Sequence, residues 1–387
     1  MSHKTFQYRI YPTKKQETTL LTWLKLLCET YNAALQERRD AYRLVGKSIG
    51  FSHQCAELPA CRQVRPDLAQ VPSQVLQDAV KRVDLAFDGF FRRCAAGEKP
   101  GYPRYKSCFR YDSMTFKQYG NSFSLEASPK ENRGTLMLAK LGHVKMVMHR
   151  PLQGTPKTAM VKRTPTGKWF VSIGCEDAPE PTVPASEKEV GIDVGLKTFA
   201  YLSDGTTLEN PRFFRQEEKK LARAQRKRDK APQKSQERKK LNKRVARVHE
   251  RTKNRRKNFA HQQSRKIVNT NGLIAVESLV VRNLIKNPKL AKSIADAAWS
   301  QFFEFLQSKA EEAGREVIRV NPAYTSQTCS CCGHHQEMPL SVRIYECPIC
   351  GLVIDRDHNG SKNILEEARA AKACGRAGCV IPEAPDL

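Results

Sequence analysis

Four cysteines near the carboxyl end of the sequence constrain its fold more than any other feature. Cys329 and Cys332 form one C-x2-C pair, Cys347 and Cys350 form a second, and 14 residues separate the pairs. Each pair can form a tight turn that presents two thiolates, and two such turns complete the tetrahedral shell of a Zn²⁺ ion. The spacing therefore predicts a zinc ribbon with one structural ion, because a closed shell leaves no open position for a substrate.

Other donor side chains beside this motif are expected to take no part in it. Cys331, His334 and His335 lie close by in the sequence, but the two pairs already supply four ligands. The chain has 13 cysteines in 387 residues, an odd number diluted along a long sequence. This usage is typical of a reducing compartment with bound metal and not of a secreted disulfide scaffold.

The net charge indicates the kind of partner. Lysine and arginine total 67 against 40 acidic residues, a formal charge of +27. A polyphosphate chain is the expected partner, and an anionic membrane surface is the alternative. No apolar run approaches the ~18 to 20 residues of a membrane-spanning helix, and the start MSHKTFQYRIYP lacks the apolar core of a signal peptide.

Two stretches concentrate this charge. Gly97–Ser113 interleaves basic and aromatic residues, which suits phosphate contact and base stacking, although an ordinary solvated loop can have the same pattern. Arg212–Lys257 has 21 lysines and arginines against 5 acids, and such blocks are often solvated or disordered. Pro232 divides it into two predicted helices. A narrow apolar seam on the second is formed by Leu241, Val245 and Val248. This seam, and the position of the segment between two predicted strands that carry acidic residues, favour a helical hairpin that leans over the cleft beside those acids.

Three acidic residues stand at the ends of predicted secondary elements. Glu189–Leu208 is predicted to form a three-stranded meander, with Asp193 near the end of its first strand. Glu277 ends the apolar strand 272–277, and Asp357 stands where a new helix should begin. An aspartate near a glycine often only starts a loop. Three such acids brought together by folding would instead hold divalent metal for phosphate chemistry.

The rest of the sequence predicts a β-barrel with a helical insertion. Thr5–Tyr11 alternates as a strand, and Thr13 to Gln16 is a capping box that should start a helix. A second helix is predicted after Ser73. Further expected elements are strands at Thr135–Ala139, Val144–His149, Thr158–Arg163, Trp169–Cys175 and Glu316–Val320, a linker at Asp177–Ser186 and a helix ending at Gly314.

Several motifs in a fixed order resemble the TnpB (OrfB) proteins of bacterial insertion sequences. GIDVGLKTFAYLSDG is followed by AVESLVVRNLIKN and then by TSQTCSCCG…CPICGLVIDRDHNGSKNIL. RIYPTKKQ, VPSQVLQDAVKRVDLAFDGFF and GYPRYK extend the resemblance to nearly the whole chain. The family is similar to the compact type V CRISPR effector nucleases. The resemblance implies RNA-guided cleavage of double-stranded DNA next to a short flanking motif, in the bacterial cytoplasm and at the nucleoid when DNA is bound.

The resemblance also implies a mixed fold: an RNase H-like (RuvC) nuclease domain interrupted by the zinc ribbon, after a wedge-like β-barrel with a helical recognition lobe. The implied boundaries are 1–12 and 97–180 for the barrel, 13–96 for the lobe, 187–322 and 353–370 for the nuclease domain with its basic hairpin at 212–266, 323–352 for the ribbon, and 371–387 for a disordered tail.

Roles for individual residues follow from the same resemblance. Asp193, Glu277 and Asp357 match the catalytic acids and would hold two Mg²⁺ ions, with Asp193 bridging them. Asp355 is expected to be a neighbouring acid, and Arg343 to assist at the scissile phosphate. The expected contacts to guide RNA and target DNA are Tyr102, Arg104, Tyr105, Lys106, Lys239, Lys240, Lys243 and Arg244. Relatives often have Asn-Ala-Ala where this chain has Asn359-Gly360-Ser361. An RNase H-like transposase and a zinc-ribbon DNA-binding regulator of transposition remain the alternatives.

Overall fold

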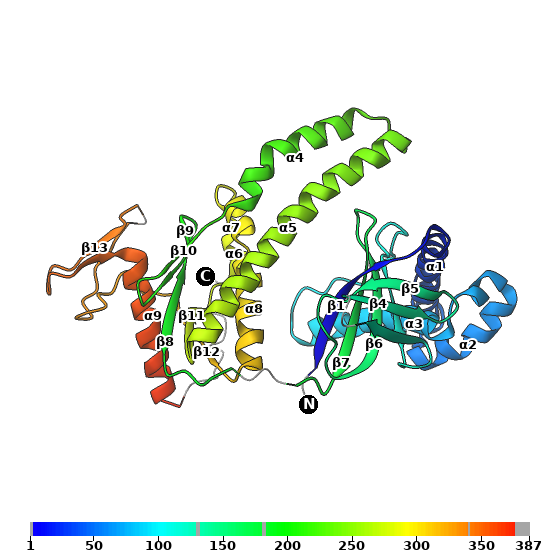
Figure 1. Cartoon of the computed structure of the whole chain (residues 1–387), viewed down its shortest axis with the longest axis horizontal. Helices are drawn as coiled ribbons and strands as arrows, with labels where there is room; N and C mark the ends of the chain where they lie inside the picture. Colours follow the sequence, from blue (N-terminus) through cyan, green and yellow to red (C-terminus); the bar gives the residue numbers. More distant parts are fainter. Residues whose placement is uncertain (1–2, 129–131, 180–182, 340, 376–387) are drawn as a thin grey trace. The chain divides into compact units, whose positions relative to one another are not determined.

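The computed structural model describes residues 3–128, 132–179, 183–339 and 341–375. The chain forms two compact units, Met1–Pro179 and Glu180–Leu387 (Figure 1). The division falls inside the stretch Asp177–Ser186 that was predicted as a linker. Among the described residues, no helix has the length and apolar character needed to cross a membrane.

The amino-terminal unit is built on a seven-stranded antiparallel sheet that curves into a barrel-like shape. Its strand order is β2-β6-β7-β1-β5-β4-β3. The strands are β1 (Lys4–Tyr11), β2 (Ser113–Lys117), β3 (Phe123–Ser128), β4 (Arg133–Leu138), β5 (Gly142–Val147), β6 (Thr155–Arg163) and β7 (Trp169–Glu176). Phe6, Tyr8 and Ile10 point into the core from alternate positions of β1, as the sequence pattern predicted. β2 and β3 are strands that the sequence reasoning did not delimit.

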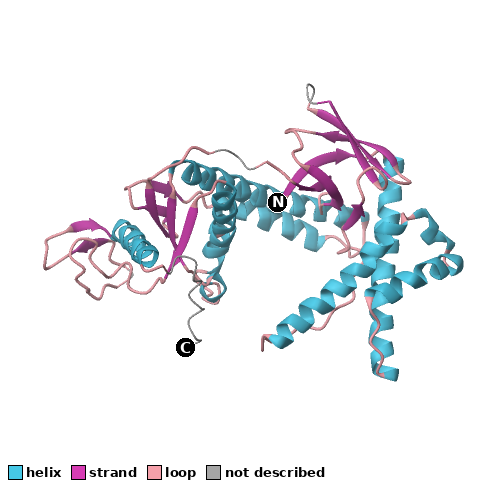
Figure 2. Cartoon of the chain, turned by 90° about the horizontal axis from the view of Figure 1, so that it is seen from below, coloured by secondary structure: helices cyan, strands magenta, loops and turns pink. Residues whose placement is uncertain are grey.

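Helices cover one side of this sheet (Figure 2). α1 (Lys14–Val45) begins at the predicted capping box, in which the Gln16 backbone N–H donates to Thr13 Oγ1 and the Thr13 N–H donates to Gln16 Oε1. α3 (Ser73–Ala95) begins where predicted. α2 (Phe51–Val64) and the short 3₁₀ helix η1 (Pro66–Gln70) were not predicted. One continuous apolar core joins the helices to the sheet.

The carboxy-terminal unit is centred on a five-stranded mixed sheet with the order β10-β9-β8-β11-β12. The strands are β8 (Glu189–Val194), β9 (Thr198–Leu202), β10 (Thr207–Glu209), β11 (Leu273–Glu277) and β12 (Glu316–Val320). β8, β9 and β10 form the predicted antiparallel meander. β11 runs parallel to both β8 and β12, and all of its residues are buried, because helices cover both faces of the sheet.

Helices α5 (Gln236–Thr270) and α8 (Trp299–Glu312) cover one face of this sheet, and α9 (Arg356–Ala373) covers the other (Figure 1). Gly191 in β8 allows α9 to come close, since a Cβ atom at that position would lie 2.0 Å from the Ser361 carbonyl oxygen. Two short helices, α6 (Val281–Leu284) and α7 (Ala291–Ala297), precede α8. The first residues of the tail predicted at 371–387 belong to α9, which continues to Ala373. Residues 376–387 lie outside the described part.

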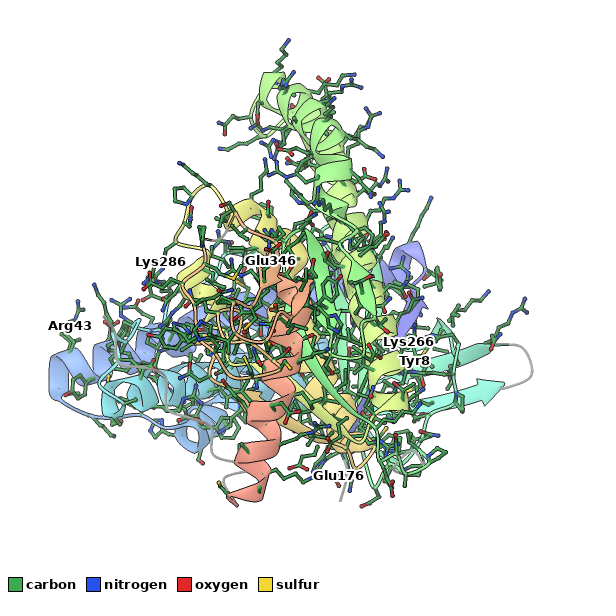
Figure 3. The ribbon with its side chains drawn as sticks, turned by 90° about the vertical axis from the view of Figure 1, so that its left-hand side faces the viewer. Tyr8, Arg43, Glu176, Lys266, Lys286 and Glu346 are labelled. Atoms are coloured by element: carbon green, nitrogen blue, oxygen red, sulfur yellow. The ribbon has the colours of Figure 1, made fainter. Side chains whose placement is uncertain are left out.

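The basic segment forms two antiparallel helices, α4 (Phe213–Lys230) and the amino-terminal half of α5, as predicted. They pack on each other through Leu221, Val245 and Val248. The tip of this hairpin projects away from the sheet (Figure 1), so the prediction that it leans over the cleft is wrong for the tip. The apolar seam holds the two helices only to each other, and long side chains that end in nitrogen surround both of them (Figure 3).

Candidate active site and metal centre

Asp193 lies at the end of β8, next to the first turns of α9. A Cβ atom at Gly360 of α9 would be 3.0 Å from Asp193 Oδ2, so the glycine leaves the carboxylate its space. Asp193 is partly buried. Burial raises the pKa of the Asp193 carboxyl well above its usual value, and the negative charges of Glu277 and Asp357 raise it further. The predicted acid therefore stands in a place where its ionised form is disfavoured.

Glu277 reaches the same place from the neighbouring strand. Val276 is level with Ile192 in the parallel pairing of β11 and β8, which puts Glu277 beside Asp193. Only 9% of Glu277 is exposed, and burial raises the pKa of its carboxyl. The hydroxyl of Thr325 donates a hydrogen bond of 2.8 Å to Glu277 Oε1 and fixes the orientation of the carboxylate. Thr325 was not identified from the sequence.

Asp357 is the second residue of α9, as the predicted helix start required. Asp355 is the N-cap of this helix, because its Oδ1 accepts hydrogen bonds from the backbone N–H groups of Asp357 and His358 at 2.9 and 3.3 Å. Burial raises the pKa of the Asp357 carboxyl, while the nearby positive charge of Arg343 opposes the shift. Asp355 thus supports the helix end that presents Asp357.

The three acids line one cavity of about 1060 Å³. A fourth acid, Asp296, also lines it. The other walls include apolar side chains (Leu196, Leu279, Leu290 and Trp299) and basic side chains (Lys197, Arg212, Arg215, Arg343 and Arg356). The cavity is large for a small-molecule pocket. Its cations suit an anionic substrate, while its carboxylates repel one another and offer only hard oxygen donors. Such a donor set fits Mg²⁺ or a similar cation, which would relieve the repulsion.

Two arginines differ in how they approach Asp357. Arg343, the predicted assistant, is half exposed, and its Nη1 lies 3.5 Å from Asp357 Oδ1. Arg356 was not singled out from the sequence, although it stands between Asp355 and Asp357. It is buried, and its guanidinium donates to the Pro339 carbonyl oxygen and to Ser326 Oγ, each at 2.9 Å. Arg356 is therefore held rigidly in the cavity wall, while Arg343 has room to move.

A further buried acid, Asp296 of α7, anchors the base of the basic hairpin. Its carboxylate accepts hydrogen bonds from the Phe214 N–H at the start of α4 and forms an ion pair of 2.9 Å with Arg256 of α5. No local pattern predicts this role, because the partners lie about 40 and 80 residues away in the chain. The four hairpin residues predicted to bind nucleic acid, Lys239, Lys240, Lys243 and Arg244, are exposed near the tip.

The cysteine pairs come together as predicted. Cys329 Sγ lies 3.6 Å from Cys350 Sγ, Cys332 Sγ lies 3.5 Å from Cys347 Sγ, and all four sulfur atoms are within 4.8 Å of one another. Backbone N–H groups, that of Cys350 first, lower the pKa of Cys347 to about 6, which favours a thiolate. The cluster is compatible with the ion of a zinc ribbon. Cys331, His334 and His335 stand outside the four-cysteine cluster, as expected.

Two short strands and a buried tyrosine support this cluster. β13 (Ile344–Glu346) pairs with β14 (Val353–Asp355), and the chain between them contributes Cys347 and Cys350. The ring of Tyr345 is fully buried and packs with Cys329 and Cys347, and its hydroxyl donates to the His334 carbonyl oxygen at 3.1 Å. The cluster is thus the core of a very small subdomain.

The predicted basic and aromatic segment between α3 and β2 has an irregular backbone. Tyr102 and Tyr105 are each nearly half exposed, and the guanidinium of Arg39 lies over both rings. Arg104 is exposed, and Lys106 is partly buried. Tyr111, the last aromatic residue of the segment, is 3% exposed and belongs to the core, so it cannot stack on a base.

Comparisons with known proteins show which family the chain belongs to. Family models match residues 299–364 ("Cas12f1-like, TNB domain"), 172–288 ("Probable transposase", OrfB of IS605) and 1–47 ("Helix-turn-helix domain"). A "Putative RNA-guided DNA endonuclease" of Streptomyces pristinaespiralis is 37% identical over 96% of this chain and 91% of its own length. The "Putative RNA-guided DNA endonuclease InsQ" of Escherichia coli K12 is 29% identical over 96% of this chain and 94% of its own length.

One solved structure has a similar fold. The protein in the "Cryo-EM structure of the Cas12f1-sgRNA-target DNA complex" superposes with a TM-score of 0.60 and 15% identity, over 94% of this chain and 98% of that one. At this identity the likeness concerns the fold alone.

Proposed function

Because the chain belongs to the TnpB (OrfB) family, we propose that it is an RNA-guided DNA endonuclease that hydrolyses phosphodiester bonds with a RuvC-like, RNase H-type acid site. The observation that carries the proposal is the convergence of Asp193, Glu277 and Asp357 on one cavity. They come from two adjacent parallel strands and one helix, and their pKa values are raised. Buried acids that only stabilise a fold are normally paired with cations, and of these three only Asp357 forms an ion pair with a described residue, at 3.5 Å from Arg343.

Together, these three carboxylates would hold two Mg²⁺ ions. When bound, the two ions supply an activated water and stabilise the leaving oxygen of the phosphodiester. Thr325 keeps Glu277 oriented, and the N-cap Asp355 holds the first turn of α9 so that Asp357 faces the cavity. Arg343 would contact the scissile phosphate, because it lines the cavity and is half exposed.

The cysteine cluster would hold one structural zinc ion in this scheme. The four cysteines would form a closed shell around it, and the subdomain has only a few apolar residues of its own, so the ion would supply much of its stability. We assign the remaining parts the domain roles implied by the family resemblance: a wedge-like barrel at 1–12 and 97–180, a recognition lobe at 13–96 and a nuclease domain at 187–322 and 353–370.

The partners we propose are a guide RNA and double-stranded target DNA. The hairpin residues Lys239, Lys240, Lys243 and Arg244 and the segment Gly97–Ser113 would contact the phosphate backbone, while base pairing to the guide would read the sequence. The relatives from Streptomyces pristinaespiralis and Escherichia coli, both named as putative RNA-guided DNA endonucleases, support both partners.

A transposase is the second candidate, since the family model over 172–288 is described as a probable transposase. An RNase H-type acid site serves strand transfer as well as hydrolysis, and the fold does not distinguish the two. The products differ: hydrolysis leaves free ends, whereas strand transfer joins them to a second duplex.

The test is to purify the protein from its host cells and to sequence the bound RNA. A discrete RNA from the flank of its own gene, together with Mg²⁺-dependent cutting of DNA complementary to that RNA, is the expected result. Purified protein that carries no discrete RNA and joins transposon ends to a target duplex would instead establish the transposase.

A further inference from the structure

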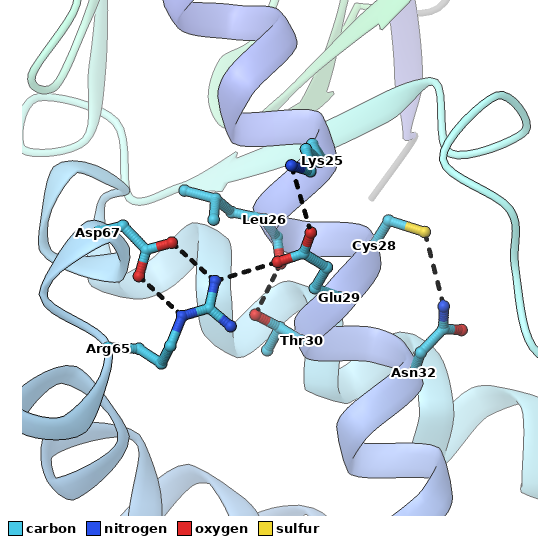
Figure 4. A network of polar contacts seen from close by, with 8 residues as sticks. All are labelled: Lys25, Leu26, Cys28, Glu29, Thr30, Asn32, Arg65 and Asp67. Atoms are coloured by element: carbon cyan, nitrogen blue, oxygen red, sulfur yellow. Dashed lines mark hydrogen bonds and ion pairs between the residues drawn. The ribbon is translucent and has the colours of Figure 1, made fainter.

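The segment between α3 and β2 is fastened to α1 at Lys106. The Lys106 backbone N–H donates to Asn32 Oδ1, and Asn32 Nδ2 donates to the Lys106 carbonyl oxygen, each at 2.8 Å. The thiol of Cys28 donates to the same carbonyl at 3.1 Å. Cys28 and Asn32 lie one helical turn apart on α1 and face the same way (Figure 4). The Asn32 amide thus pairs with the Lys106 backbone as a neighbouring strand would, and fixes where its side chain starts.

The side chain of Lys106 covers two buried rings. Its ammonium lies 4.2 Å from the centre of the Tyr31 ring and 5.6 Å from that of Tyr111, and these rings are 2% and 3% exposed. Burial lowers the pKa of Lys106, and the positive charge of Arg82 adds to this effect. The lysine therefore has a defined position in a partly desolvated place.

Lys106 has no ion pair in the described part of the chain. The acid closest in sequence, Asp112, pairs with Lys162 at 3.4 Å, and Asp78 pairs with Arg82 at 2.9 Å. Arg65, which lies near α1, has the acidic partners that a cation usually has: Asp67 and Glu29 lie 2.7 and 3.1 Å from its guanidinium (Figure 4). A partly buried cation without an anion is costly, and two aromatic faces compensate for this only in part.

We propose that the Lys106 ammonium is a binding site for one phosphate of the guide RNA, and that Asn32 is the residue that positions it; this inference rests on the proposed function. Tyr102 and Tyr105 present half-exposed rings beside the site, with Arg39 over both. Stacking on such rings requires unpaired bases, which favours a single-stranded segment of RNA over duplex DNA.

The experiment measures the affinity of RNA-free protein for an in vitro transcript of the RNA that copurifies with the wild type, as a function of salt. Lys106→Met should lower affinity by about tenfold and flatten the plot of log K against log salt by about 0.7, the value for one phosphate contact with a single strand. Lys106→Arg should restore most of both quantities. Asn32→Ala should lower affinity in the same direction, and combining it with Lys106→Met should add little further loss.

A matched control removes the same charge elsewhere in the unit. Lys157 is exposed and already paired with Glu176 at 3.3 Å, so Lys157→Met should leave the slope unchanged. A wild-type slope in Lys106→Met, with a lower melting temperature of the RNA-free protein, would overturn the proposal and leave Lys106 as a cover for the two rings. A change seen only for duplex DNA would also overturn it. Wild-type protein that binds no RNA would instead contradict the proposed function itself.

Discussion

The acid cluster and the cysteine cluster lie in the same unit and are opposites in construction. The three acids stand at the ends of a strand pair and a helix and border a cavity of about 1060 Å³. The four sulfur atoms lie within 4.8 Å of one another, and the fully buried ring of Tyr345 packs with Cys329 and Cys347. In both sets the ionised side chains would repel one another without a cation between them. The carboxylates line an open cavity, whereas the sulfur atoms point toward one another.

This difference separates two uses of metal ligands. A closed set satisfies every position of its ion, so its binding free energy serves folding. An open set leaves positions for water and a phosphate. Its carboxylates are held close together by the ends of β8, β11 and α9, and this unfavourable arrangement raises their pKa values. Substitutions in the acids should therefore change chemistry and spare stability, and substitutions in the cysteines should affect stability first.

The largest expected effect is on cleavage. Asp193→Ala, Glu277→Ala or Asp357→Ala should each lower the rate of guided DNA cleavage by about a thousandfold or more, since each removes an oxygen ligand that no neighbour replaces. Binding of RNA and DNA should persist. Asp355→Asn is the matched control, because asparagine also caps a helix and should retain much of the activity. Wild-type cleavage by Asp357→Ala in Mg²⁺ would remove Asp357 from the site.

The next effect is on folding. Cys329→Ser or Cys350→Ser should lower zinc content and melting temperature together, by about 2–4 °C for each kcal/mol lost in a unit of this size. Cys331→Ser should change neither, since Cys331 is exposed and stands outside the four-cysteine cluster. Elemental analysis and thermal unfolding of the same preparations measure both. Folded wild-type protein without zinc would end the assignment of a structural ion.

A third expected effect is on nucleic-acid binding and not on the cleavage reaction. Changing Lys239, Lys240, Lys243 and Arg244 together to alanine should weaken nucleic-acid binding for all sequences and reduce the salt slope by about 0.7 to 0.9 for each lost phosphate contact. These residues are exposed near the tip of a hairpin that projects away from the sheet, so the cutting position and the flanking-motif preference should not change. Equal slopes in the wild type and the variant would mean that this face does not contact nucleic acid.

The smallest effect is expected when the hydrogen bond that orients the Glu277 carboxylate is removed. Thr325→Val removes the hydrogen bond to Glu277 and should lower cleavage or Mg²⁺ affinity about 10- to 100-fold, the range measured for such supporting partners. Thr325→Ser keeps the hydroxyl and should stay near the wild type. If valine and serine behaved alike, the orientation of Glu277 would not limit the reaction.

Local patterns in the sequence predicted the elements that present both clusters. The apolar runs and turn residues of 189–208 gave the meander, the cysteine spacing gave the four-sulfur cluster, and the capping box gave the start of α1. α2 was missed because its apolar periodicity is weak and Pro59 lies inside it. In each successful case the signal was contained within about twenty residues of sequence.

What could not be predicted depends on contacts between distant parts of the chain. Thr325 and Asp296 carry no local motif, and their roles exist only because folding brings Glu277 and the start of α4 to them. Tyr111 belongs by composition to the basic and aromatic segment, yet it is buried against Tyr31. The direction of the hairpin tip also depends on how α5 packs on the sheet. The apolar seam joins only α4 and α5, so it does not predict this direction.

The most direct test of the account is cleavage directed by a reprogrammed guide. Protein reconstituted with its own RNA, in which only the targeting segment has been replaced, is incubated in Mg²⁺ with a plasmid that carries the new target beside the flanking motif. If the acid site performs guided cleavage, the wild type makes one double-strand cut at the new target and Asp193→Ala makes none at equal RNA occupancy. A cut that stays at the old position, or that Asp193→Ala makes at the wild-type rate, would contradict this role of the acid site.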